Sequence, residues 1–400
     1  TSSVLDYSST GGSGKKMAYD FDTLVDRDPA IRGTGKYRIM KDSKGNKPPK
    51  GIVPFSVADM EFRTAPEIID AIKAEADFGV FGYHRLTDGF RQACCDWMKR
   101  RHNWQVSPEW IVPFEQVVPA LYNAIYAFTA PGDGIIVQVP AYHHFFHATQ
   151  HCGRTVIENP LKLVDGKYYF DFDDLRQKAK SAKMLMLCSP YNPVGRVWTE
   201  EELKELGDIC IENGVLIVAD EIHHDLIMKP FVHRVFASLG EKYAKNCIVT
   251  TSLSKTFNLA GLCFASIIIP DPEIRSKFTK QMNVLGFLHI NRLGVVAAEA
   301  AYRYGDAWLD ELIEYVKGNY EFLKAFMAER FPKVKVYDME GTYLAWFDMS
   351  PLGLAPKELD VFLTDDAMLY FDPDTAFGVK GECFQRINLA CPRKLLSDAL

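Results

Sequence analysis

Four side chains able to do polar chemistry each follow a short apolar run in this sequence. The runs are rich in aliphatic and β-branched residues, which predicts buried β-strands. In chain order they are Tyr142 after 134–139, Asn192 after 184–188, Asp220 after 215–219 and Lys255 after 247–251. Helical segments separate the runs, so the strands should lie parallel, with their carboxyl ends at one edge of a sheet. We therefore expect the four side chains to share one crevice.

These residue types suit an aromatic aldehyde that carries a phosphate. An amine such as that of Lys255 can form a Schiff base with the aldehyde, and the carboxylate of Asp220 can keep a pyridine nitrogen protonated. Asn192 can donate to a phenolate oxygen, and the ring of Tyr142 can stack on a flat heterocycle. Considered alone, each residue also has an ordinary structural interpretation. Lys255 would be an exposed lysine, Asp220 a helix cap, Asn192 a turn residue and Tyr142 a core aromatic. Their order at successive strand ends favours the joint reading.

A helix beginning near Pro119 would complete such a site. Proline suits the first position of a helix, and the apolar pattern continues to about Phe128. The unpaired N–H groups at a helix start attract anions. We therefore predict a phosphate site next to Val117 and Val118.

Composition narrows the class of protein. The chain has 400 residues, of which 48% are hydrophobic, and a formal net charge of −6. Neither a basic stripe nor a polybasic run is present, so we expect no nucleic acid and no membrane surface as partner. No apolar run approaches the roughly 18 residues that span a bilayer, and no secretory leader is recognisable. Nine scattered cysteines without a C-x-x-C pair predict reduced thiols, a cytoplasmic location and no metal site.

The pattern of elements predicts an α/β fold in two domains. Residues 1–16 are rich in Ser and Gly and are expected to be either a disordered tail or residues added to the native chain, outside the fold in both cases. Residues 66–299 should form a large domain with a mainly parallel sheet covered by helices. Residues 17–65 and 300–400 should together form a smaller α+β domain.

Longer motifs make the sequence resemble a known family. It is similar to the fold-type I pyridoxal-phosphate enzymes, the aspartate aminotransferase superfamily, and within them to the cystathionine β-lyase and cystalysin group, the MalY/PatB C–S lyases. The resemblance runs from Met17 to the last residue. Its motifs are 57–62, 81–83, 117–120, 189–198, 220–223, 252–261, 340–344 and 386–389. The implied fold is that of PLP-dependent transferases of type I.

The resemblance implies a role for each matching residue. Lys255 would carry pyridoxal 5'-phosphate and then take the Cα proton, Asp220 would pair with the ring nitrogen, and Tyr142 would complete the catalytic set. Further cofactor contacts are implied for Asn192, Val117, Val118, Ser252, Ser254, His223 and, from the partner subunit of a homodimer, Tyr83. Substrate carboxylate contacts are implied for Arg386, Asn192 and Ala58.

Four positions depart from the patterns of related enzymes, and one of them is His223, where aspartate-type transaminases carry a tyrosine. Cys263 stands where many aminotransferases carry a phosphate-binding arginine, and Gln116 replaces a small residue before the phosphate loop. His143 stands where some cystalysin-like enzymes have a second tyrosine. The absent arginine agrees with the lyase group and weighs against an aspartate-type transaminase.

The implied activity is α,β-elimination on a small amino-acid substrate. Cystathionine, cystine or a related cysteine S-conjugate would yield thiol, pyruvate and ammonia, since a thiolate with a pKa of about 8.5 is a reasonable leaving group. An aminotransferase on the same fold is the main alternative. A lyase for sulfoxides or other secondary metabolites and a protein with an added regulatory role are the others.

Overall fold

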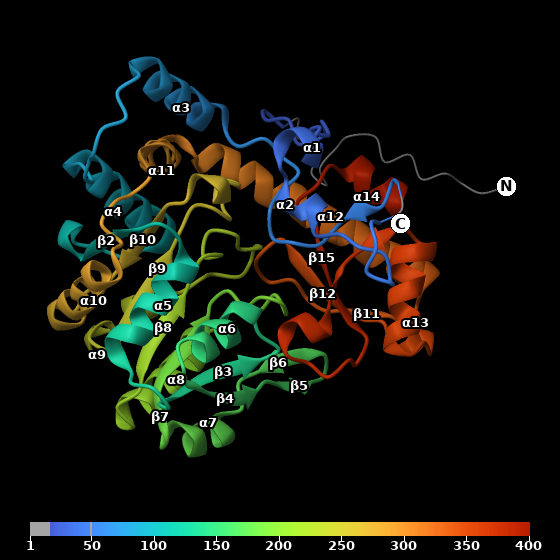
Figure 1. Ribbon diagram of the computed structural model, residues 1–400. Helices are drawn as coiled ribbons and strands as arrows, with labels where there is room; N and C mark the ends of the chain where they lie inside the picture. Colours follow the sequence, from blue (N-terminus) through green and yellow to red (C-terminus); the bar gives the residue numbers. More distant parts are fainter. Residues whose placement is uncertain (1–16, 49) are drawn as a thin grey trace.

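A computed structural model describes residues 17–48 and 50–400 of the chain (Figure 1). The expected tail, residues 1–16, lies outside the described residues. Among the described helices, none combines the length and the apolar character needed to cross a membrane.

A seven-stranded sheet forms the centre of the larger part of the molecule. Its order is β2-β10-β9-β8-β7-β3-β4. Only β10 runs antiparallel to its neighbours, so the predicted α/β fold with a mainly parallel sheet is confirmed. The strands are β2 (Ile111–Phe114), β3 (Gly134–Val139), β4 (Thr155–Pro160), β7 (Ala182–Cys188), β8 (Leu216–Asp220), β9 (Cys247–Thr251) and β10 (Ala265–Ile268).

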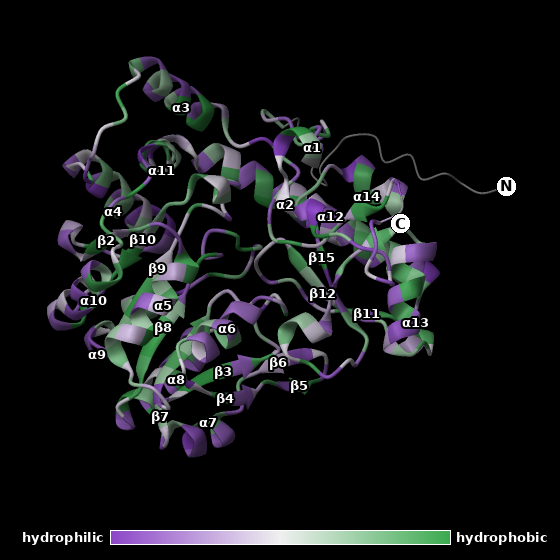
Figure 2. Ribbon diagram, in the orientation of Figure 1, coloured by the Kyte–Doolittle hydropathy of each residue, from purple (hydrophilic) through white to green (hydrophobic). Residues whose placement is uncertain are grey.

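Helices cover this sheet and bury an apolar stripe against it. Figure 2 shows strands that are mostly hydrophobic and outer helices that carry many hydrophilic residues. This pattern is typical of a sheet buried on both faces. The helices of this part are α3 (Pro66–Phe78), α4 (Asp88–His102), α5 (Val117–Phe128), α6 (His143–His151), α7 (Phe172–Ala179), α8 (Glu200–Glu212), α9 (Glu241–Ala244), α10 (Pro272–Leu285) and α11 (Arg292–Tyr304). A small hairpin joins β5 (Lys162–Val164) to β6 (Lys167–Tyr169).

One predicted helix start was wrong by two residues. Helix α5 begins at Val117, and Pro119 is its third residue. Proline is tolerated throughout the first turn, because the N–H groups there have no partner within the helix. The sequence pattern therefore indicated the first turn correctly but not its first residue.

The C-terminal part has its own antiparallel sheet, of order β11-β12-β15-β14. Figure 1 shows the blue N-terminal segment beside these orange and red elements. Their contact is direct, because β1 pairs with β13 and the amide of Asn388 donates to the carbonyl of Phe55. The elements are α1 (Pro29–Arg32), α2 (Gly35–Arg38), β1 (Val53–Pro54), α12 (Asp306–Arg330), β11 (Lys335–Val336), β12 (Leu344–Asp348), α13 (Pro356–Val361), β13 (Leu369–Tyr370), β14 (Asp372–Pro373), β15 (Phe384–Asn388) and α14 (Arg393–Ala399). This pairing supports our proposal that residues 17–65 and 300–400 form one small domain.

Candidate active site

A pocket of about 370 Å³ opens at the carboxyl edge of the central sheet. Nearly all the site residues expected from the sequence line it, so long-range folding brings together segments that are far apart in the chain. The lining includes Ala58, Val117, Val118, Tyr142, Asn192, Asp220, His223, Ser252, Ser254 and Lys255. Two expected residues, Arg386 and Tyr83, are not part of the lining of this pocket.

Lys255 projects into the pocket from the turn that follows β9. Its Nζ donates to the carbonyl oxygen of Ala58 at 2.7 Å, and the hydroxyl of Tyr343 donates to the same oxygen at 2.9 Å. Burial lowers the pKa of Lys255 to about 8, with Asp59 opposing the shift and Arg386 adding to it. A lysine with this pKa is partly neutral near pH 7.5, and the neutral amine is the form that acts as nucleophile or base.

Asp220 ends β8 at the floor of the same pocket. The side chain is buried, and its Oδ1 accepts from the amide of Ile222 at 3.2 Å. Burial raises the pKa of Asp220 to about 7. Within residues 17–48 and 50–400, no cationic side chain forms an ion pair with it. A buried carboxyl group without a cation suits a ligand that brings its own positive charge.

The first turn of α5 closes one end of the pocket. Val117 and Val118 line it there, and Pro119 has no N–H, so the first bond of the helix runs from the amide of Ala120 to Gln116. The N–H groups of the two valines therefore have no hydrogen-bond partner within the helix and suit an anion.

The turn before Lys255 offers a second hydrogen-bond donor that suits an anion. The hydroxyl of Ser252 donates to the carbonyl of Phe264 at 2.8 Å and accepts from the amide of Ser254 at 3.1 Å. Because the Ser252 proton is already used, Ser254 is the better donor to a phosphate.

Gln116 and Cys263, two residues that differ from the family pattern, are in contact at this end of the pocket. The amide Nε2 of Gln116 lies 3.2 Å from the Sγ of Cys263, to which it donates. Neither group carries a positive charge. Among the described residues, no arginine lines the pocket, and the helix start and Ser254 offer donors for an anion at this end.

Arg386 reaches the pocket indirectly from β15. One guanidinium nitrogen donates to the Oδ1 of Asn192 at 2.8 Å, and the other bonds Asp372. The Nε of Arg386 is buried and has no hydrogen-bond partner among the described residues. Because Arg386 fixes the oxygen of Asn192, the NH₂ group of that amide remains as the donor. An anionic substrate group beside Arg386 could use the free Nε.

Ala58 lies on a loop held in a strained conformation. The preceding residue, Val57, has φ of 52°, which is unfavourable for a β-branched residue. The side-chain amide of Asn388 holds the loop by donating to the carbonyls of Val57 and Asp59, at 2.8 and 2.6 Å. The carbonyl that receives Lys255 is therefore fixed from the C-terminal part of the molecule.

Tyr83 and His223 occupy contrasting positions. Tyr83 lies between α3 and α4, is 91% exposed and places its ring 4.8 Å from that of His289. His223 lines the pocket and is buried, and its Nδ1 finds no partner in the described part of the chain. Burial holds the pKa of His223 well below its usual value, so the imidazole is neutral.

A buried network behind Lys255 was missed from the sequence. Thr256 donates its hydroxyl to the Oδ2 of Asp225 at 2.8 Å. The Oδ1 of Asp225 accepts from Trp97 at 3.0 Å and lies 2.7 Å from the Nε2 of His102. These groups join helix α4 to the turn that carries Lys255. No local pattern in the sequence indicates that Trp97 and Asp225 meet.

Comparisons with known proteins show the family to which the chain belongs. The family described as aminotransferase class I and II matches residues 50–400. Cystathionine beta-lyase PatB of Bacillus subtilis is 42% identical over 350 residues, which are 87% of this chain and 90% of that protein. Protein MalY of Escherichia coli is 31% identical over 388 residues, which are 96% of this chain and 97% of that protein.

Solved structures of the same kind superimpose closely. Cystalysin from Treponema denticola, which contains a pyridoxal 5'-phosphate cofactor, has a TM-score of 0.92 and 39% identity over 96% of this chain and 97% of that one. The PLP-bound C–S lyase from Staphylococcus hominis has a TM-score of 0.86 and 30% identity over 95% and 96%. These likenesses confirm the predicted fold of PLP-dependent transferases.

The network behind Lys255 gives a stability prediction. Thr256→Val should lower the free energy of unfolding by about 1–3 kcal/mol, because the buried carboxylate of Asp225 loses one donor. Thr256→Ser keeps the hydroxyl and is the matched control, expected to lose less. Urea denaturation of the three proteins measures the difference. A Thr256→Val variant as stable as the parent would show that the hydroxyl does not support the network.

Proposed function

Since the chain belongs to the aminotransferase class I and II family, we propose that it is a pyridoxal 5'-phosphate-dependent carbon–sulfur β-lyase. Cystathionine, cystine or related cysteine S-conjugates are cleaved to a thiol, pyruvate and ammonia. The observation that carries this proposal is the meeting of Lys255, Asp220 and the start of α5 in one pocket. The relatives PatB and cystalysin support the reaction type.

The residues of the pocket fit the cofactor. When bound, pyridoxal phosphate supplies an electron sink that stabilises negative charge at the substrate Cα. Asp220, buried without a cation, suits its ring nitrogen, and the NH₂ group of Asn192 suits its ring oxygen. Tyr142 offers an aromatic face, while Val117, Val118 and Ser254 offer donors for the phosphate.

Lys255 is also the base that removes the proton from Cα. Because burial lowers the pKa of Lys255 to about 8, a larger fraction of the amine is neutral near pH 7.5 than for an ordinary lysine. The carbonyl of Ala58 holds the amine by a 2.7 Å hydrogen bond. Because Tyr343 donates to the same oxygen, that carbonyl stays satisfied when Lys255 moves toward a proton.

Arg386 is proposed to bind the substrate carboxylate with help from Asn192 and the backbone at Ala58. Its two terminal nitrogens are held by Asn192 and Asp372, which fixes the plane of the guanidinium group. A fixed plane reduces the entropy lost on binding a carboxylate.

A homodimer in the cytoplasm completes the proposal. Tyr83 is 91% exposed and lies outside the pocket of its own chain, as a residue that serves a neighbouring chain would. The nine cysteines are unpaired, and eight of them are buried, which suits a reducing compartment.

The reaction type is tested by a product assay. Purified protein supplied with pyridoxal phosphate and L-cystathionine should form pyruvate, ammonia and thiol in equal amounts without any keto acid. Lys255→Ala should remove this activity, because both the cofactor link and the base are lost. Glutamate formed only when 2-oxoglutarate is added, without thiol, would make the protein an aminotransferase instead.

The carboxylate contact is tested at Arg386. Arg386→Lys keeps the charge but loses the planar fork, so KM for L-cystathionine should rise about 10- to 100-fold, as expected for a lost charge-assisted hydrogen bond. The visible absorbance of the bound cofactor should be retained. Arg303→Lys, which alters an exposed arginine of α11, is the matched control. An unchanged KM in the Arg386→Lys variant would contradict this role.

The role of Tyr83 across subunits is tested by mixing inactive variants. Refolding Tyr83→Phe together with Lys255→Ala should restore roughly one quarter of the parent activity, because half the dimers are mixed and each has one intact site. If Tyr83 served the pocket of its own chain, no mixture would recover activity. The Tyr83→Phe variant alone must first show a clear loss.

A further inference from the structure

A group of four histidines lies along helix α6, directly after Tyr142. His143 and His147 are four positions apart, as are His147 and His151, while His144 and His147 are three apart. These spacings place side chains on one side of a helix. The absence of a metal site predicted above rested on the spacing of the cysteines, whereas this group contains only histidines.

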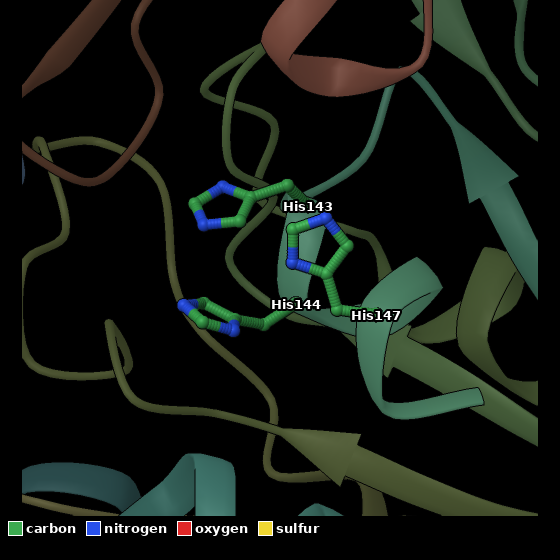
Figure 3. A group of neighbouring side chains, drawn as sticks. All are labelled: His143, His144 and His147. Atoms are coloured by element: carbon green, nitrogen blue, oxygen red, sulfur yellow. The ribbon is translucent and has the colours of Figure 1, made fainter. Parts of the chain in front are cut away.

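Three of the imidazoles converge. Figure 3 shows the rings of His143, His144 and His147 gathered at the start of α6. One ring nitrogen from each lies within 4.8 Å of the other two. Two nitrogens on one tetrahedral zinc ion are about 3.4 Å apart, given Zn–N bonds of about 2.05 Å. Small side-chain rotations would therefore bring all three onto one ion.

The three rings are free to act as ligands. Within the described ranges, no hydrogen bond or ion pair occupies a ring nitrogen of His143, His144 or His147. His143 and His144 are half-buried at the start of α6. Neutral imidazole is the form that binds metals. His147 is exposed, so an ion can arrive from solvent.

We propose that His143, His144 and His147 form a binding site for a divalent transition-metal ion of the zinc class. Three neutral nitrogen ligands favour Zn²⁺, Cu²⁺, Ni²⁺ or Co²⁺ over the oxygen-seeking Mg²⁺ and Ca²⁺. With three protein ligands, a tetrahedral ion keeps one position open to water or to a small ligand.

The place of this site couples it to the pocket. His144 lines the pocket itself, and His143 follows the pocket residue Tyr142. Because His144 lines the pocket, a cation bound to its ring also lies beside the pocket. A bound divalent cation should therefore narrow substrate access and slow turnover. This second part of the inference rests on the proposed lyase function, whereas metal binding itself does not.

The metal site is tested by binding alone. Holoenzyme free of any histidine tag and stripped with a chelator is titrated with Co²⁺, which absorbs visible light when tetrahedral, and with Zn²⁺ by calorimetry. We expect one ion per chain, and His147→Ala should weaken binding at least about tenfold. His289→Ala removes an exposed histidine outside the group and should bind as the parent does. The proposed metal site would be overturned if the protein did not bind one ion per chain. It would also be overturned if the His147→Ala and parent proteins bound the ion with equal affinity.

The effect on turnover is measured in the same proteins. Zn²⁺ should inhibit the parent and the His289→Ala variant, a chelator should reverse the inhibition, and His147→Ala should be resistant. Equal sensitivity of the His147→Ala variant would refute the coupling to the pocket. Should no lyase activity be found at all, the Co²⁺ spectrum and the calorimetry still decide whether the histidines bind metal.

Discussion

Burial of an amine and a carboxyl group in one pocket is the constraint on which the structure of this site depends. Water would favour the charged form of each group, and burial opposes that preference in both. The pKa of Lys255 falls to about 8 and that of Asp220 rises to about 7, so both approach neutrality near physiological pH. Neither forms a direct ion pair with another described residue. Burying such groups without a partner lowers the stability of the folded chain unless a bound ligand pairs with them.

Two parts of the molecule share the task of holding these groups. The central sheet places Asp220 and Lys255 at neighbouring strand ends, because β8 and β9 pair in register. The C-terminal sheet supplies Arg386. It also supplies Asn388, which holds the strained loop around Ala58, the residue whose carbonyl accepts from Lys255. A buried ion pair between Lys36 and Glu61 holds the far side of that loop at 2.9 Å. The pocket thus depends on contacts between segments that are distant in the sequence.

The sequence predicted those parts of the site that follow from local patterns. Strand ends locate Tyr142, Asn192, Asp220 and Lys255, since apolar runs mark buried strands and parallel strands end together. Arg386 could be assigned only through family resemblance, because nothing near it in the chain signals a partner such as Asn192. The start of α5 was misplaced by two residues, since proline fits several positions of a first turn.

Other features required the folded chain. The carboxylate of Asp225 binds groups from α4 and from the turn after Lys255, and no spacing in the sequence indicates that meeting. Gln116 and Cys263 both differ from the family pattern and are far apart in the sequence, but their side chains are in contact in the folded chain. The convergence of His143, His144 and His147 depends on side-chain directions at the start of α6, which only the folded chain shows.

The proposed function requires the amine of Lys255 to hold the cofactor. The most direct measurement is reduction of the purified holoenzyme with borohydride, followed by digestion and mass spectrometry of its peptides. We expect one reduced pyridoxal-phosphate adduct per chain, located on Lys255 and missing from Lys255→Ala. An adduct on another lysine, or no stoichiometric adduct on protein that binds the cofactor, would contradict it.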